Sequence, residues 1–154
     1  MEQPRIVAWS IRLRRVHRRL ADALAQARDS IETGTPVAPV VDPLTACWAF
    51  CVALDGHHEG EDAALFPAVR AARPDLAPVL DELARDHRMI GDLIEALSRD
   101  LSAGAPAGDL LRHLDGIEAI MTTHVRWEEK RLLGVIDAVT MPAVDTTSVL
   151  GPLG

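Results

Sequence analysis

The most informative stretch of this chain comprises residues 57–67, which read HHEGEDAALFP. Two imidazoles and three carboxylates fall within six consecutive positions here, between the apolar run 49–54 and a proline. Residues 124–133, which read HVRWEEKRLL, repeat the scheme: a histidine, acids four and five residues later, and an apolar pair eight and nine residues later. A solvated helix face does not pair histidines in this way, and an ordinary apolar core does not include the acids. We therefore expect the rest of the chain to form a scaffold for these two segments.

The composition is that of a single globular domain. The chain has 154 residues, of which 48% are hydrophobic and 25% charged, and this length allows a sizeable core. It contains no apolar run of the roughly 20 residues that a membrane span needs, and no signal-like apolar segment at its start, so we expect a cytoplasmic protein without a membrane partner. The net charge of −7 argues against a nucleic-acid partner. The arginine cluster in residues 12–19 is a partner surface or a solvated helix face, and the lack of interleaved aromatic residues favours the second reading.

Hydrophobic periodicity predicts four helices separated by segments rich in proline and glycine. The expected helices span residues 4–32, 42–71, 78–101 and 109–139. We expect Asp42 and Asp109 to cap the second and the fourth helix. Amphipathic helices with short connections predict an all-α fold, an antiparallel up-down-up-down four-helix bundle. It would occupy residues 1–140, followed by an irregular C-terminal tail at 141–154.

The spacing of four histidines predicts that they meet inside this bundle. His17, His57, His87 and His124 each lie in an inward-facing stripe. Residues of antiparallel helices sit at one height when they are equally far from the turn between them. His87 precedes the turn at 102–108 by 15 residues, and His124 follows its end at 109 by 15 residues. At about 1.5 Å of rise per residue, the mismatches along the bundle stay within one helical turn.

Two glutamates complete this group of side chains. Glu61 and Glu128 follow His57 and His124 by four residues and therefore share their helix faces. Six polar groups buried together would be costly without compensation, and bound metal supplies that compensation. Imidazole and carboxylate donors without thiolates suit iron, manganese or zinc. Six ligands exceed the needs of one tetrahedral zinc and fit two metals bridged by the glutamates. The predicted ligands are His17, His57, Glu61, His87, His124 and Glu128.

The order of these motifs resembles the hemerythrin-like (HHE cation-binding) family over residues 4–139. The resemblance implies a four-helix bundle around a non-haem di-iron site, with Glu61 and Glu128 bridging the irons and the histidines terminal. It implies an additional oxo or hydroxo bridge, with zinc or manganese as substitute metals. Family members bind dioxygen, peroxide or nitric oxide, and serve as oxygen carriers, sensors, iron handlers or peroxide-reactive proteins.

The chain departs from the oxygen-carrying members of that family at two places. Those proteins have a second histidine four residues after the third-helix histidine, where this chain has Gly91. They also have an aspartate five residues after the last histidine, whereas this chain offers Glu128 at four and Glu129 at five. Glycine cannot ligate a metal. An open position on the metals favours reactivity with peroxide or electron donors over reversible oxygen carriage.

We therefore expect a non-haem di-iron protein that binds or reacts with dioxygen, hydrogen peroxide or nitric oxide, with catalase-like or peroxidase-like turnover as an enzymatic form of that activity. The alternative is a non-enzymatic sensor of oxygen, nitric oxide or iron, or an iron-binding module, that acts through a protein partner. A third reading is a zinc-stabilised or metal-free interaction bundle.

A second pair with the same spacing competes with the chosen one. His58 and Asp62 are rotated by about 100° from His57 and Glu61 on the same helix. The trailing Phe66 and its proline favour His57 and Glu61, and we expect His58 at a helix interface or behind the ligands.

Several other residues receive structural interpretations. His113 lies about 16 Å along the helix axis from His124 and is not expected to bind metal. Asp86 is either a support for a ligand or a surface residue. Trp127 is expected to pack in the core rather than to carry an electron. Cys47 and Cys51 share one helix face, as buried core residues or as a redox pair, and the first reading is favoured.

Overall fold

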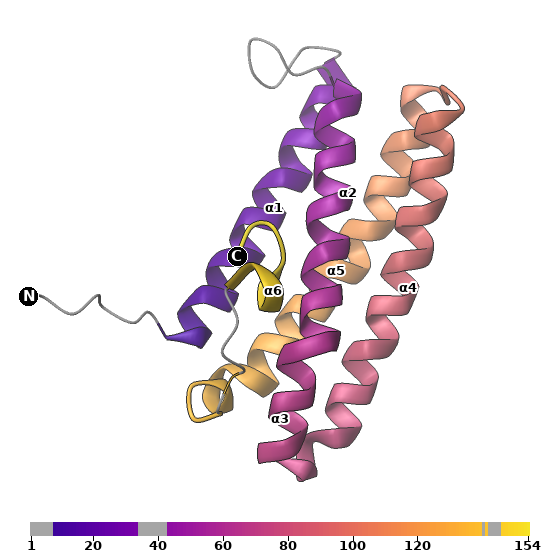
Figure 1. Ribbon diagram of the computed structural model, residues 1–154. Coiled ribbons are helices and arrows are strands. Elements are labelled where there is room, and N and C mark those ends of the chain that lie inside the picture. Colours follow the sequence, from indigo (N-terminus) through magenta and orange to yellow (C-terminus); the bar gives the residue numbers. More distant parts are fainter. Residues whose placement is uncertain (1–7, 34–42, 140, 142–145) are drawn as a thin grey trace, which may run out of the picture.

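The computed structural model describes residues 8–33, 43–139, 141 and 146–154, and within these ranges the chain is helical and contains no strand. The expected all-α helical bundle is confirmed (Figure 1). In chain order the elements are α1 (Trp9–Thr33), α2 (Pro43–Gly60), the π-helical turn η1 (Glu61–Leu65), α3 (Phe66–Ala72), the 3-10 turn η2 (Pro74–Leu76), α4 (Ala77–Ser102), α5 (Ala107–Ile136) and α6 (Thr146–Leu150).

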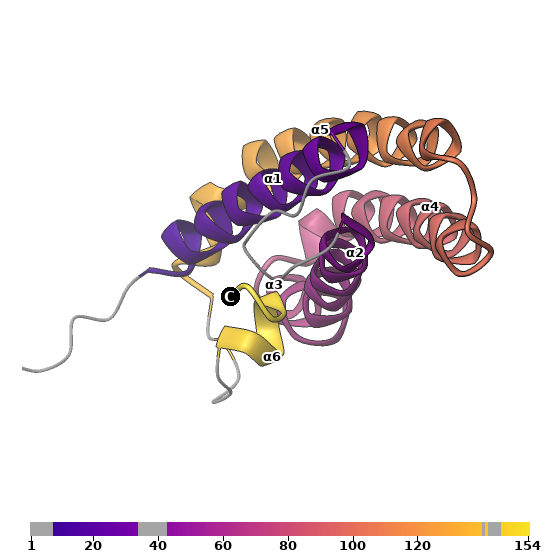
Figure 2. The ribbon, with the colours of Figure 1, turned by 90° about the horizontal axis from the view of Figure 1, so that it is seen from above.

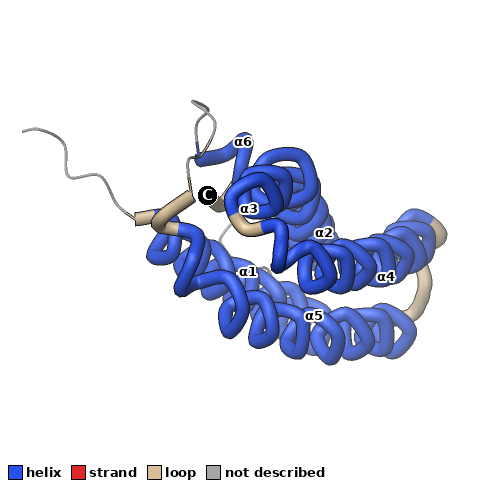
Figure 3. Tube along the Cα trace, turned by 90° about the horizontal axis from the view of Figure 1, so that it is seen from below, coloured by secondary structure: helices blue, strands red, loops and turns tan. Residues whose placement is uncertain are grey.

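The long helices alternate in direction and form two layers. Helix α1 runs antiparallel to the continuous rod of α2, η1 and α3, and α4 runs antiparallel to α5 (Figure 1). Seen along the bundle, α1 lies beside α5 in one layer, and α2 lies beside α4 in the other (Figures 2 and 3). Contacts also join α1 to α2 and α4 to α5 across the layers. The centre of the bundle is thus enclosed by a face of each long helix.

Leucine and isoleucine side chains fill most of that centre. They occupy the inward stripes because residues three and four apart share one face of a helix. Burial of each such side chain contributes roughly 1.5–3 kcal/mol. The largest fully buried side chains are Phe50, Leu13, Leu20, Leu54, Leu65, Leu80, Leu83, Ile90, Leu97, Leu114, Ile117 and Leu132.

The outer faces of the helices carry the charged residues. Arg14, Arg15, Arg18 and Arg19 are exposed on α1, as a solvated helix face requires. Arg28 binds Asp115 and Glu118 across the α1–α5 layer. In the described part of the chain, none of the helices is both long and apolar enough to cross a bilayer.

The turn between α4 and α5 explains where both helices end. Gly104 has a left-handed φ of +69°, and the N–H of Ala105 donates to the Asp100 carbonyl at 3.0 Å, as in a glycine-terminated helix. Helix α5 then begins earlier than expected, with Pro106 rather than Asp109 at its N-cap. Asp109 lies in the first turn, where the helix dipole favours a negative charge. Its expected capping role was wrong, and Asp42 lies outside the described residues.

The second expected helix contains an irregularity that periodicity did not predict. At η1 the N–H of Phe66 donates to the carbonyl of Glu61, five residues back, which adds one residue to the ordinary helical turn. Such π turns are found mostly at functional sites. This one begins at Glu61, a predicted metal ligand. The helical rod continues through it to Ala72.

The C-terminal tail was expected to be irregular, yet residues Thr146–Leu150 form the short helix α6. Val149 and Leu150 are fully buried, because α6 packs against α2 and η1. A single helical turn is too short to produce a detectable hydrophobic period.

Candidate metal centre

The structure brings all six predicted ligands together at mid-bundle, each of them buried. Their donor atoms form two groups, in each of which the atoms lie within 4.8 Å of one another. The first group is Glu61, His58, His87 and His124, and the second is Glu61, His17, His57 and Glu128. Every long helix of the bundle contributes to the centre, and Glu61 belongs to both groups.

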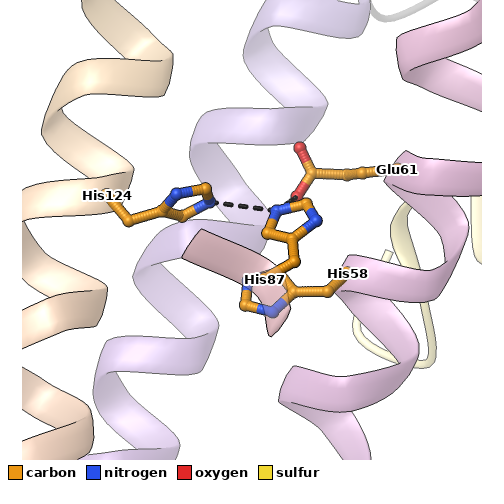
Figure 4. Close-up of side chains that lie close together, drawn as sticks. All are labelled: His58, Glu61, His87 and His124. Atoms are coloured by element: carbon orange, nitrogen blue, oxygen red, sulfur yellow. Dashed lines mark hydrogen bonds and ion pairs between the residues drawn. The ribbon is translucent and has the colours of Figure 1, made fainter. Parts of the chain in front are cut away.

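His58 joins the first group, although the sequence led us to expect it outside the ligand set. Its ring stacks on that of His87, with centroids 4.0 Å apart and planes 12° from parallel, and Figure 4 shows both rings beside Glu61 and His124. His57 faces the second group instead. Successive residues point about 100° apart on a helix, and the centre is wide enough for His57 and His58 to reach different halves of it. Of the two competing pairs, His57 with Glu61 and His58 with Asp62, both histidines face the centre. The Asp62 side chain does not, because it is 45% exposed.

In four of the histidine rings, Nδ1 is directed away from the centre and forms a hydrogen bond with an oxygen acceptor. Because an acceptor on that side requires the proton on Nδ1, the inward nitrogen Nε2 of each neutral ring presents a lone pair to the centre. The contacts are His17 with Glu129 at 3.2 Å, His57 with the Leu150 carbonyl at 3.0 Å, His87 with Asp62 at 2.8 Å, and His124 with Asp86 at 3.0 Å.

The inward atoms of the centre lie close to one another. His57 Nε2 lies 2.8 Å from a Glu61 oxygen, and the Nε2 atoms of His87 and His124 lie 3.1 Å apart. Both oxygens of Glu61 and of Glu128 are buried without a hydrogen-bond partner, as are the Nε2 atoms of His17 and His57. Buried acceptors in contact repel each other unless a cation lies between them. The donor set therefore fits metal ions.

Comparison with protein families agrees with this geometry. The family model described as "Hemerythrin HHE cation binding domain" matches residues 11–136. The chain belongs to this family. Comparisons with curated proteins and with solved structures found no match.

The separations in this HHE domain suit ions at the usual ligand distances. Two donors that each lie about 2.1 Å from one ion, at right angles, are about 3 Å apart. His57 to Glu61 and His124 to Glu128 have this spacing, at 2.8 and 3.0 Å. The other Glu128 oxygen lies 3.7 Å from His17 Nε2. The two oxygens of Glu128 thus face one histidine of each donor group.

The charges of the two glutamates shift the pKa values around them. Burial, reinforced by the charge of Glu61, raises the pKa of Glu128. Burial would lower the pKa of His124, but the Glu128 carboxylate at 3.0 Å and the charge of Glu61 raise it to about 9. Burial and the neighbouring His17 lower the pKa of His57 to about 3, and burial likewise lowers that of His58. The pocket therefore favours positive charge at its centre, carried by a proton on His124 in the metal-free state or by a bound cation, while His57 and His58 stay neutral.

A surface hollow of about 300 Å³ between α1 and α5 reaches the second group. It is lined by His17, Ala21, Met121, Thr122, Val125, Arg126 and Glu129. A small molecule entering here meets His17 and the Glu129 carboxylate that supports it. The hollow therefore leads from the surface to His17 of the second group.

The remaining candidates lie outside the donor groups. His113 bonds Asp100 at 2.6 Å, and Trp127 is partly buried beside Lys130 and Arg131. Cys47 and Cys51 are buried free thiols.

The supporting residues were mostly missed from the sequence. Asp86 precedes His87 in the chain but supports His124 on another helix, a contact that spacing along one helix cannot reveal.

Proposed function

We propose that this HHE domain holds two iron ions and binds or reacts with a small oxidant or radical ligand: dioxygen, hydrogen peroxide or nitric oxide. The observation that carries the proposal is the pair of buried donor groups that share Glu61 and leave both glutamates unpartnered. A pair of iron ions supplies one-electron and two-electron redox chemistry when bound.

The donor set supports iron over softer metals. It consists of imidazole and carboxylate groups, which suit iron, manganese and zinc. The thiols of Cys47 and Cys51 belong to neither donor group. Seven side chains exceed what one ion of about six positions can use, so a pair of ions accounts for them better.

Each donor group leaves room for an external ligand. The first offers four donors, from His58, Glu61, His87 and His124, and the second offers four, from His17, His57, Glu61 and Glu128. An ion of about six positions would keep a place free in either group. The hollow beside His17 opens toward the second group, which supports entry of the small molecule on that side.

Metal analysis of protein purified without oxygen tests the proposal. Fe(II) loading should give two irons per chain, and addition of dioxygen or peroxide should change the ultraviolet-visible spectrum. Glu61→Gln should lose at least one ion, whereas His113→Ala, outside the donor groups, should keep both. A chain that holds zinc alone, or no metal, would refute the di-iron proposal.

The same sample separates an enzyme from a ligand-binding protein. Continuous oxygen release from added peroxide would identify catalase-like turnover. A stoichiometric spectral change without turnover would identify a binding or sensing role.

A further inference from the structure

The C-terminal segment, residues 146–154, lies outside the family match at 11–136 but contacts the metal centre. In Figures 1 and 2 it is the yellow element, beside α2 and α1. Arg12 donates to the Thr146 hydroxyl at 3.0 Å, and Arg19 donates to the Leu153 carbonyl at 2.8 Å. These bonds, with the buried side chains of Val149 and Leu150, fix the segment against the bundle.

One main-chain atom of the segment orients a metal-binding ring. The Leu150 carbonyl lies 3.0 Å from His57 Nδ1. A carbonyl only accepts, so Nδ1 must carry the proton and Nε2 must face Glu61 as a lone pair. For the His17, His87 and His124 rings the corresponding partner is a carboxylate side chain. The orientation of His57 thus depends on the main chain of a segment 93 residues away.

Three glycines permit this close approach. A Cβ on Gly60 would lie 2.5 Å from the Val149 carbonyl oxygen, and one on Gly56 would lie 2.8 Å from the Pro152 ring. On the segment itself, Gly151 has a left-handed φ of +85°, and a Cβ there would lie 2.5 Å from the His57 amide nitrogen. Gly56 and Gly60 are four apart and form one flat strip on α2. Glycine inside a helix is less stabilising than alanine, and both glycines lie where the C-terminal segment crosses α2.

We propose that the C-terminal segment is a working part of the metal centre, and that the Leu150 carbonyl is the positioning group for His57. This inference rests on the proposed metal site. Because α2 carries His57, His58 and Glu61, displacement of the segment should first free the His57 ring. Loss of such a supporting contact typically weakens metal binding by about 10–100-fold.

Alanine substitutions in the full-length chain test the role of the segment. Gly56→Ala should push Pro152 away and lower the affinity for Fe(II) by about 10-fold or more. The double variant Gly56→Ala/Pro152→Ala removes the colliding ring atoms and should restore the affinity. Gly116→Ala, at a helical glycine whose Cβ meets nothing within 4 Å, is the matched control and should bind as the wild type does. Alanine strengthens a helix, so a weaker helix cannot explain a loss at Gly56.

Nuclear magnetic resonance of the His57 ring separates positioning from packing. Two-bond nitrogen–proton spectra of the zinc-loaded and metal-free protein report which ring nitrogen carries the proton. The wild type should show a protonated Nδ1 in slow exchange with solvent, and Gly56→Ala should lose this signal while keeping those of His87 and His124. Gly60→Ala, which meets the Val149 main chain instead, is the second variant and should behave alike.

The outcomes distinguish this inference from the proposed function. If Gly56→Ala and Gly60→Ala bind metal as the wild type does and keep the His57 signal, the role of the segment is refuted and the metal site stands. If the wild type binds no metal, the proposed function fails and this inference fails with it.

Discussion

The His58 ring lies where it could supply the imidazole that the sequence lacks at Gly91. Oxygen-carrying relatives place a second histidine one turn after the third-helix histidine, and at Gly91 a Cβ would meet nothing within 4 Å. The His58 ring instead stacks on His87 from α2. The third imidazole of the first group thus comes from a neighbouring helix.

Removal of His58 should therefore weaken metal binding, in contrast to what the sequence alone suggested. We expect His58→Ala to lose one ion per chain, or to bind it at least 10-fold more weakly, because the first group falls to two imidazoles. Metal titration with elemental analysis measures this. The double variant His58→Ala/Gly91→His, which places an imidazole one turn after His87, should recover part of the loss. Unchanged metal content in His58→Ala would exclude His58 from the ligand set.

Sequence reasoning named six of the seven side chains in the two donor groups but not His58. The six predicted residues were found from helix faces and distances to turns, both of which follow from regular helix geometry. Whether His57 or His58 faces inward cannot be decided this way, because two residues 100° apart can both reach a centre that spans two ions. The supporting carboxylates Asp62, Asp86 and Glu129 each act across a helix interface, which requires the packed structure.

The helices meet at turns whose geometry particular residues impose. The α4–α5 turn sets the height of His87 against His124 through Gly104, whose φ of +69° suits glycine. An L side chain in the left-handed region costs about 1–2 kcal/mol.

Gly104→Ala should accordingly destabilise the protein by about 1 kcal/mol. Gly134→Ala replaces a helical glycine of α5 whose Cβ would meet nothing within 4 Å, and should instead stabilise it by up to about 1 kcal/mol. Urea unfolding followed by circular dichroism gives both values. Equal effects of the two substitutions would contradict the structural difference between the sites.

At the scale of elements, periodicity predicted the four long helical segments but not the π turn or α6. The π turn keeps Leu65 and Phe66 buried, so the hydrophobic pattern hides the added residue at Glu61. Helix α6 packs close to Gly60, and Pro152 after it packs close to Gly56; glycines within a predicted helix do not indicate which segment will pack on them.

At the scale of the whole molecule, the buried charge of Glu128 should make its substitution change the stability of the metal-free and the metal-bound protein in opposite directions. Burial and Glu61 raise the pKa of Glu128 above its ordinary value of 4.5. A raised carboxyl pKa in the folded state means that ionised Glu128 destabilises the metal-free fold at neutral pH. This penalty disappears below about pH 4.5, where the unfolded chain is protonated as well.

Glu128→Gln should therefore stabilise the metal-free protein at pH 7, by about 1 kcal/mol, and have little effect at pH 4. With metal bound, the wild type should instead be more stable than Glu128→Gln, because the variant loses the stabilisation that bound metal provides. Thermal unfolding with and without metal, at both pH values, measures the crossover. A variant that is less stable than the wild type in both states would show that Glu128 is not an unpartnered charge.

The centre takes its donors from α1, α2 with η1, α4 and α5, while the two thiols, Cys47 and Cys51, are free and lie on one helix. Bound ions would accordingly cross-link four helical segments that no disulfide connects. A chelator would then act on this protein as a reducing agent acts on a secreted one, by cutting its cross-links. Under the proposed di-iron function, scarcity of iron would therefore loosen the packing of the helical bundle.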